Sequence, residues 1–172
     1  MRTKSILDVM MAVGGLWTAI SSANAAAYTF TQIDVPGATA EAHGINDAGD
    51  IVGWFASTTG THGFLDSGGS FTQIDAPPNP IAPNATDTMP SGINDAGQIV
   101  GTFNSISGGN HGFLYTGGSF TQFDVPGATL GTLAYGINNV GQIVGTFDYH
   151  GFLDTSGSFT QIDVPGAFFT AA

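Results

Sequence analysis

Three histidines recur in one sequence context and could together bind a metal ion. His62, His111 and His150 each begin a His-Gly-Phe-Leu segment. Three imidazoles are a known ligand set for catalytic zinc, provided that the fold brings them close together. Alternatively, each histidine starts a strand and hydrogen-bonds nearby, since a signature that recurs with a repeat is typical of repeat architecture. We favour the structural role and keep the three histidines as candidate metal ligands.

Asparagine and aspartate also recur as a pair. Asn46-Asp47 and Asn94-Asp95 have their counterpart in Asn138-Asn139. These segments lack the alternating carboxylates of a calcium-binding loop. Asn and Asp favour turns because their side chains bond to the nearby backbone. We therefore expect structural turns here.

A second set of aspartates ends a recurring Phe-Thr-Gln-x-Asp segment. Its members are Asp34, Asp75, Asp124 and Asp163. Each stands shortly before a proline, so we expect it to cap the following turn; a ring of cation-binding carboxylates is the alternative. Acid–base catalysis needs carboxylates in unlike environments, which repetition disfavours. With no Gly-x-Ser-x-Gly, phosphate-loop or His-Glu-x-x-His motif, we predict no catalytic residue, no cofactor and no enzymatic activity.

One aromatic residue departs from the repeat pattern. Trp54 stands where the other copies have Thr102 and Thr146. An exposed tryptophan could stack on a sugar ring, whereas a buried one would fill a gap at the end of the array. Trp54 is therefore the candidate residue for binding a carbohydrate ligand.

These residues belong to a repeat that is about 40 to 50 residues long, a period typical of propellers and solenoids. The segment at residues 44–55 (GINDAGDIVGWF) recurs at 92–103 and 136–147. Each period resolves into four short strands: one ends at Gly-Ile-Asn, and the others contain Ile-Val-Gly-x-Phe, His-Gly-Phe-Leu and Phe-Thr-Gln-x-Asp. The pairs Gly68-Gly69, Gly117-Gly118 and Ser156-Gly157 suit two-residue hairpin turns.

The strands carry adjacent apolar pairs such as Ile99-Val100 and Phe113-Leu114. Neighbours in a strand point to opposite faces, so both faces are apolar, as in a propeller blade between two others. We predict an all-β fold of tandem four-stranded antiparallel units, propeller-like, with three blades plus an extra strand; a β-trefoil or β-prism is the alternative. Propellers usually have four to eight blades, so we expect an open arc, a ring completed by oligomerisation or a truncated array.

The middle repeat is longer than the others. The additional residues are rich in proline, from Pro77 to Pro90. Proline favours turns and cannot donate a backbone hydrogen bond. We expect the whole segment to be an irregular surface loop.

Residues 1–25 are predicted to be a signal peptide. Arg2 and Lys4 precede a mostly apolar run, and Ala23-Asn24-Ala25 fits the small-x-small pattern of a cleavage site. Residues 26–172 then form a single β-repeat domain, with repeats at about 30–70, 71–119 and 120–158 and a partial repeat at 159–172. We predict a secreted, periplasmic or extracellular protein. The chain has no cysteine, so no disulfide holds it.

The charge of the chain narrows its partners. It has 13 Asp and Glu but only 2 Lys and Arg, and both basic residues lie in the predicted signal peptide. Phosphate groups are bound chiefly by Lys and Arg, so we predict no nucleic-acid partner and no membrane partner after cleavage. Candidate partners are a second copy of the chain through exposed strand edges, neutral glycans and other extracellular proteins.

The order of the motifs resembles a known family. Gly-Ile-Asn-x-x-Gly-x-Ile-Val-Gly followed by His-Gly-Phe-Leu is similar to the HAF-type extracellular repeat proteins of bacteria, with glycine in place of the signature alanine three times. The resemblance covers roughly residues 28–172 and implies an exported, propeller-like β-repeat protein. It implies no activity and no site residue. We therefore predict a non-catalytic structural or interaction module, with carbohydrate binding as the alternative.

Overall fold

The computed structural model describes residues 29–33, 35, 37–77, 85–105 and 109–172. The predicted signal peptide and Asp34 lie outside this part. The chain divides into two units, Met1–Thr31 and Gln32–Ala172, and the second contains every strand of the described residues. The first copy of the Phe-Thr-Gln-x-Asp segment forms no strand at residues 30–33.

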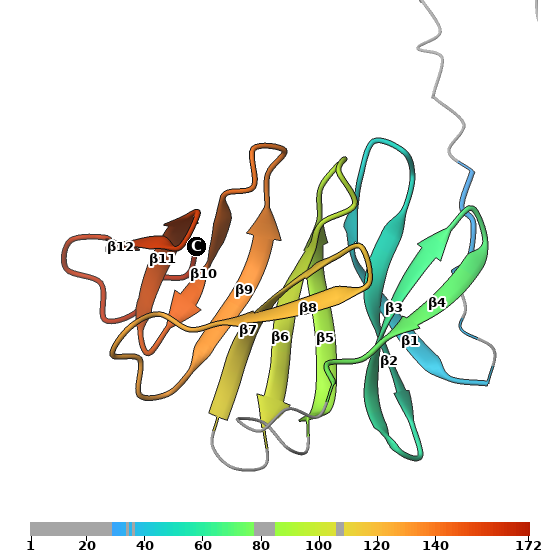
Figure 1. Cartoon of the computed structure of the whole chain (residues 1–172), viewed down its shortest axis with the longest axis horizontal. Coiled ribbons are helices and arrows are strands. Elements are labelled where there is room, and N and C mark those ends of the chain that lie inside the picture. Colours follow the sequence, from blue (N-terminus) through green and yellow to red (C-terminus); the bar gives the residue numbers. More distant parts are fainter. Residues whose placement is uncertain (1–28, 34, 36, 78–84, 106–108) are drawn as a thin grey trace, which may run out of the picture. The chain divides into compact units, whose positions relative to one another are not determined.

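The described residues form twelve strands and no helix, which confirms the all-β prediction. The strands fall into three sets of four in chain order, and Figure 1 shows these sets following one another along the molecule. We call these sets the first, second and third repeat. They are β1 (Thr39–Ile45), β2 (Ile51–Ser57), β3 (Gly60–Ser67) and β4 (Ser70–Ile74); β5 (Ala85–Ile93), β6 (Ile99–Ser105), β7 (Gly109–Thr116) and β8 (Ser119–Phe123); and β9 (Thr132–Ile137), β10 (Ile143–Phe147), β11 (His150–Thr155) and β12 (Ser158–Ile162).

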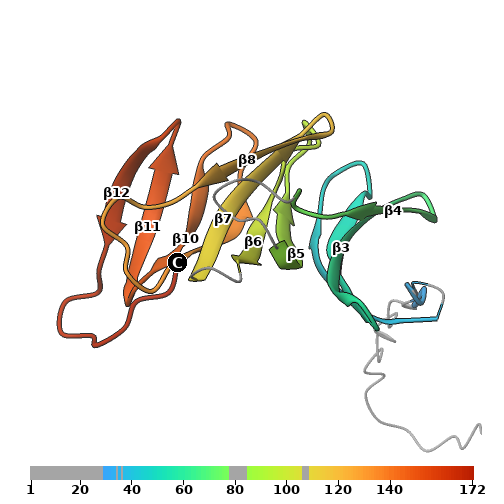
Figure 2. The same cartoon turned by 60° about the horizontal axis from the view of Figure 1, so that its bottom comes forward.

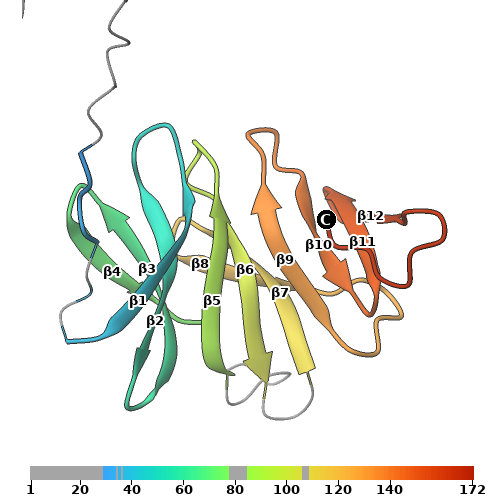
Figure 3. The ribbon, with the colours of Figure 1, turned by 180° about the vertical axis from the view of Figure 1, so that it is seen from behind.

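Within each repeat, every strand pairs antiparallel with the next along the chain. Among the residues that the structure describes, hydrogen bonding defines two sheets, neither of which is closed. The first and second repeats share an eight-stranded sheet because β3 and β5 pair in parallel at Thr61 and Asp87, whereas the third repeat is a separate four-stranded sheet. Figure 3 shows β5 beside the first repeat and β9 beside the second.

The last hairpin of each repeat turns at the two predicted residues. The backbone φ angles are 61° and 88° at Gly68 and Gly69, and 54° and 85° at Ser156 and Gly157. Positive φ at both central residues matches the right-handed twist of the flanking strands. The turn therefore sets the pairing of β3 with β4 and of β11 with β12.

We predicted that the whole proline-rich segment is a loop, and this prediction is wrong for its last part, which forms a strand. Residues 78–84 lie outside the described part, but β5 begins at Ala85, and Pro90 lies inside this strand and is fully buried. The register with β6 shifts between Pro90 and Gly92, so a β-bulge accommodates a residue that cannot donate to the sheet. The first repeat has the same irregularity between Ala42 and Gly44.

In the described part of the chain, the core consists of two apolar clusters, one on each face of the second repeat. Ile99 belongs to the cluster shared with Val52 of the first repeat, and Val100 belongs to the cluster shared with Ile143 of the third. Both Ile99 and Val100 are almost fully buried, so the predicted burial of both faces is confirmed for this pair. Figure 2 shows the second repeat between the other two. Within the described residues, no helix has the length and apolarity that crossing a membrane requires.

Candidate functional site

Each repeat contains a cluster of one histidine, one aspartate and one glutamine. His62 donates from Nδ1 to Asp75 Oδ1 over 3.0 Å, and Gln73 donates to the second oxygen of the same carboxylate. The equivalent histidine–aspartate distances are 2.9 Å for His111 and Asp124 and 2.8 Å for His150 and Asp163. In the three described copies the aspartate therefore accepts from a histidine and a glutamine of its own repeat, in place of the turn cap that we predicted, and Asp34 lies outside the described residues.

The hairpin register brings these side chains together. His62 precedes Gly68 by six residues and Asp75 follows Gly69 by six, so the two face each other across β3 and the chain after β4. A phenylalanine of the preceding strand also packs on each ring: the centroids of Phe55 and His62 are 5.4 Å apart. In the third repeat, two hydrogen bonds lower the pKa of the Asp163 carboxyl. The bond from Gln161 has the larger effect and the bond from His150 the smaller.

The three histidines lie in three separate clusters, each bound to the aspartate of its own repeat. Among the described residues, no group of three or more His, Cys, Asp or Glu side chains is arranged to hold a metal ion. With Nδ1 donating to a carboxylate, each imidazole has only Nε2 left as a nitrogen that could bind a metal ion.

The first repeat adds two hydroxyls to its cluster. Thr59 Oγ1 lies 2.8 Å from His62 Nε2, and Ser57 Oγ lies 3.1 Å from the same nitrogen. Serine, histidine and aspartate are thus connected in the order of a nucleophile, base and orienting group. We did not predict this arrangement because no serine motif marks it; the signal is Ser57 five residues before His62 across a tight turn.

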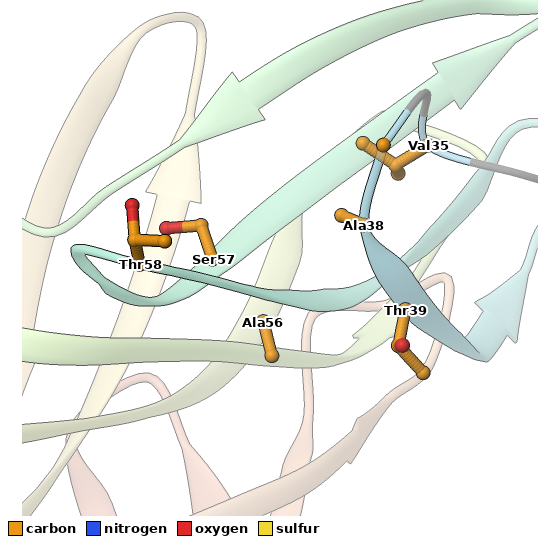
Figure 4. Close-up of a pocket in the computed structure, with 7 residues that line it drawn as sticks. Val35, Ala38, Thr39, Ala56, Ser57 and Thr58 are labelled. Atoms are coloured by element: carbon orange, nitrogen blue, oxygen red, sulfur yellow. The ribbon is translucent and has the colours of Figure 1, made fainter.

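Ser57 also lines an open hollow of about 610 Å³. Figure 4 shows Ser57 and Thr58 on one side of this hollow, and Val35 and Ala38 on the other. The Ser57 oxygen is held within its own turn, where it accepts a hydrogen bond from Thr59 N at 3.0 Å. This role in the turn accounts for the position of Ser57 without any substrate.

The Asn-Asp segments form structural turns, as predicted. Asn46 Oδ1 accepts from Asp50 N at 2.9 Å, and Asn94 and Asn138 bond the backbone of their own turns in the same way. Hydrogen bonds from Ser67 and then from Asn46 lower the pKa of the Asp50 carboxyl.

The same turns are also bonded to one another from repeat to repeat. Asn46 Nδ2 donates to Asn94 O at 3.3 Å, and Asn94 Nδ2 donates to Asn138 O at 3.0 Å. Backbone N–H groups add a second row: Asp47 N donates to Asp95 Oδ1 at 2.9 Å, and Asp95 N donates to Asn139 Oδ1 at 3.0 Å. We call these contacts the turn ladder.

Trp54 lies in β2, is half-buried, and borders a groove to which all three repeats contribute. Its ring stacks on that of His43, with centroids 6.2 Å apart and planes inclined by 23°. The groove has a volume of about 580 Å³ and is lined by His43, Trp54, Met89, Ser91, Thr102, Asn104, Asn110, Leu133 and Tyr135. These side chains are aromatic, aliphatic or neutral and polar, apart from His43. Sequence reasoning singled out Trp54 but not its neighbours, because they come from different repeats.

A comparison of the chain with protein-family models, with curated proteins and with solved structures finds no match in any of the three. The resemblance to HAF-type repeat proteins therefore remains a prediction from the motifs.

Proposed function

We propose that this protein is a secreted, non-catalytic interaction module built from propeller-like β-repeats. The observation that carries the proposal is that each cluster of polar side chains joins parts of the fold to one another. The His–Asp–Gln clusters join the two strands of a hairpin, and the turn ladder joins successive repeats. Packing of both faces of the second repeat supports a propeller-like array over a β-trefoil or a β-prism.

The arrangement of Ser57, His62 and Asp75 provides the sharpest test of the non-catalytic role. The same His–Asp–Gln cluster recurs in every repeat, which is typical of an architectural link. The purified protein should therefore hydrolyse activated esters no faster than a Ser57→Ala variant. Hydrolysis by the unmodified chain that Ser57→Ala abolishes would contradict the proposal, and so would stoichiometric labelling of Ser57 by a phosphonate probe.

Binding of a neutral carbohydrate is a second candidate function, and the groove at Trp54 favours it. Aromatic rings stack on the apolar face of a sugar, and amides and hydroxyls bond its hydroxyls. Trp54 and Tyr135 supply the rings, while Asn110 and Ser91 supply polar groups. Asn104 also lines the groove; its Nδ2 donates to Asp87, and its Oδ1 is buried without a partner among the described residues.

A glycan array tests this second candidate. The unmodified protein should bind a class of neutral glycans, and Trp54→Ala should weaken that binding by about tenfold or more, the equivalent of 1.4 kcal/mol. Tyr135→Phe retains the ring and serves as the conservative control. Circular dichroism should confirm that both variants are folded. The candidate fails if no glycan binds reproducibly, or if Trp54→Ala binds as tightly as the original chain.

A further inference from the structure

Successive repeats pack through the same pair of faces, and these faces differ. One face, which we call the leading face, carries a glycine and a valine: Gly44 and Val52, Gly92 and Val100, or Gly136 and Val144. The opposite, trailing face carries two isoleucines, such as Ile93 and Ile99 in the second repeat. Val52 shares a cluster with Ile93 and Ile99, and Val100 packs with Ile137 and Ile143. Each contact between repeats is therefore leading face on trailing face.

The glycines of the leading faces pack directly against the next repeat. A Cβ on Gly44 would lie 3.1 Å from Gly92 Cα, and a Cβ on Gly92 would lie 3.1 Å from Gly136 Cα. A Cβ on Gly136 would meet only Val144 Cγ2, at 3.4 Å. The third repeat therefore has a leading face of the same construction with no further repeat against it among the described residues.

The apolar side chains of the two outer faces are correspondingly exposed. Val52 and Val100 are 0% exposed, whereas Val144 is half-buried. On the trailing side, Ile93 is 7% exposed but Ile45 of the first repeat is 67% exposed. Val52 and Val100 are each covered by the isoleucine pair of the following repeat. Ile45 and Ile51 of the first repeat form the third such pair, and no valine of another repeat covers it among the described residues.

The turn ladder ends in complementary groups. In both rows of the ladder the earlier repeat donates and the later repeat accepts, and one further bond, from Asn139 Nδ2 to the Asp95 carboxylate, runs in the opposite direction. The third repeat therefore ends in donors, Asn139 N–H and Asn138 Nδ2, and the first repeat begins with acceptors, the Asp47 carboxylate and Asn46 O. Neither outer end has a ladder partner among the described residues. Asn94, in the middle, is 3% exposed, while Asn138 is exposed.

We propose that the leading face of the third repeat binds the trailing face of the first repeat of a second copy, head to tail. Val144 then packs on Ile45 and Ile51 of the second copy, Gly136 packs against its Gly44, and Asn139 N donates to its Asp47. The interface repeats the contact that the chain makes twice within itself. The inference names one partner for the proposed interaction module, and it is independent of glycan binding.

Residues 170–172 occupy part of the site that the second copy would take in this proposal. Thr170 Oγ1 accepts from Val164 N at 3.1 Å, as Thr132 Oγ1 accepts from Val125 N, and Thr170 N donates to Tyr149 O. The segment 170–172 thus lies where the first strand of a following repeat would begin. In the proposed complex, residues 40–42 of the second copy occupy this site and displace the segment 170–172.

Two substitutions test the two faces of this interface individually, because each disrupts one face and leaves the other unchanged. Ile45→Asp places a charge on the trailing face, where the exposed side chain contributes little to the fold. Gly136→Val fills the leading face, where a Cβ has room in the single chain. A head-to-tail contact is heterologous, so each variant retains one functional face and cannot pair with itself.

Sedimentation velocity on the mature protein gives the readout. The unmodified chain should associate as its concentration rises, each variant alone should remain a monomer, and an equimolar mixture of the two variants should form a heterodimer of twice the monomer mass. The proposal is overturned if the unmodified chain stays monomeric, or if either variant associates like the original chain, as pairing of strand edges would require. A mixture that stays monomeric while both variants are folded by circular dichroism also overturns it.

Discussion

At the scale of single residues, carboxylates serve as acceptors that fix local geometry. The third repeat shows this most clearly at Asp148, whose φ is 49°. Its Oδ1 accepts from Leu130 N at 2.7 Å and from Thr129 N at 2.8 Å, and these backbone bonds lower the pKa of the carboxyl. One side chain thereby fastens the loop before β9 to the turn between β10 and β11.

This contact predicts a dependence of stability on pH. Because the pKa of Asp148 is lower in the folded chain than in the unfolded chain, its contribution is complete above the unfolded pKa of about 3.9. The contribution is lost as the pH falls from there through the lowered folded pKa. The free energy of unfolding should therefore fall more steeply below about pH 4 for the original chain than for Asp148→Asn. Urea titrations from pH 2 to pH 6 measure the two slopes, and equal slopes would exclude this role for Asp148.

Much of the residue-scale chemistry could have been predicted, but not all of it. The bonds of Asn46 and Asn94 to their own turns follow from local geometry, so sequence reasoning found them. The pairing of His62 with Asp75 was not predicted, although the hairpin register set by the Gly68-Gly69 turn places these two residues opposite each other. The turn ladder could not be predicted, because it depends on which turns the packing of whole repeats places side by side.

At the scale of elements, threonine hydroxyls connect the end of one repeat to the start of the next. Thr88 Oγ1 accepts from Ala76 N at 3.0 Å, and Thr132 Oγ1 accepts from Val125 N at 2.9 Å. Both threonines are almost fully buried. The backbone N–H concerned lies just after the end of β4 or β8 and has no partner in the sheet. The threonine hydroxyl accepts its hydrogen bond instead.

Replacement of Thr132 by valine, which is close in shape, should destabilise the protein. Val125 is 6% exposed, so its N–H would lose its partner in a dry environment, at a cost of about 1 to 3 kcal/mol. Thr170→Val is the matched control, because Val164 is 59% exposed and water can replace the hydroxyl. Thermal and urea unfolding compare the two variants. A loss of stability as large in Thr170→Val as in Thr132→Val would contradict this explanation.

Strands and hairpins were largely predictable, because the glycine turns and adjacent apolar pairs specify them locally. Pro90 was the main error. Proline is typical of loops, but the register shift after Pro90 accommodates it in β5, where its side chain is fully buried and lies against Gly63 of the first repeat.

At the scale of the whole β-repeat unit, the arrangement depends on close contact between the leading face of one repeat and the trailing face of the next. The glycines at the ends of β1, β5 and β9 let the backbones of successive repeats approach, and the valines and isoleucines fill the remaining space. Gly92 lies between two repeats, whereas Gly136 has a neighbour on one side. The sequence shows the three glycines as equivalent, and only the packing distinguishes them.

The stability of two alanine variants tests this account most directly. In a solution dilute enough to keep the chain monomeric, Gly92→Ala should lower the free energy of unfolding by about 1 to 3 kcal/mol, because its Cβ would press on the backbone at Gly136. Gly136→Ala should change it by about 0.5 kcal/mol or less, because among the described residues its Cβ meets only Val144. Equal losses in the two variants, or a larger loss in Gly136→Ala, would contradict the packing of repeats face on face.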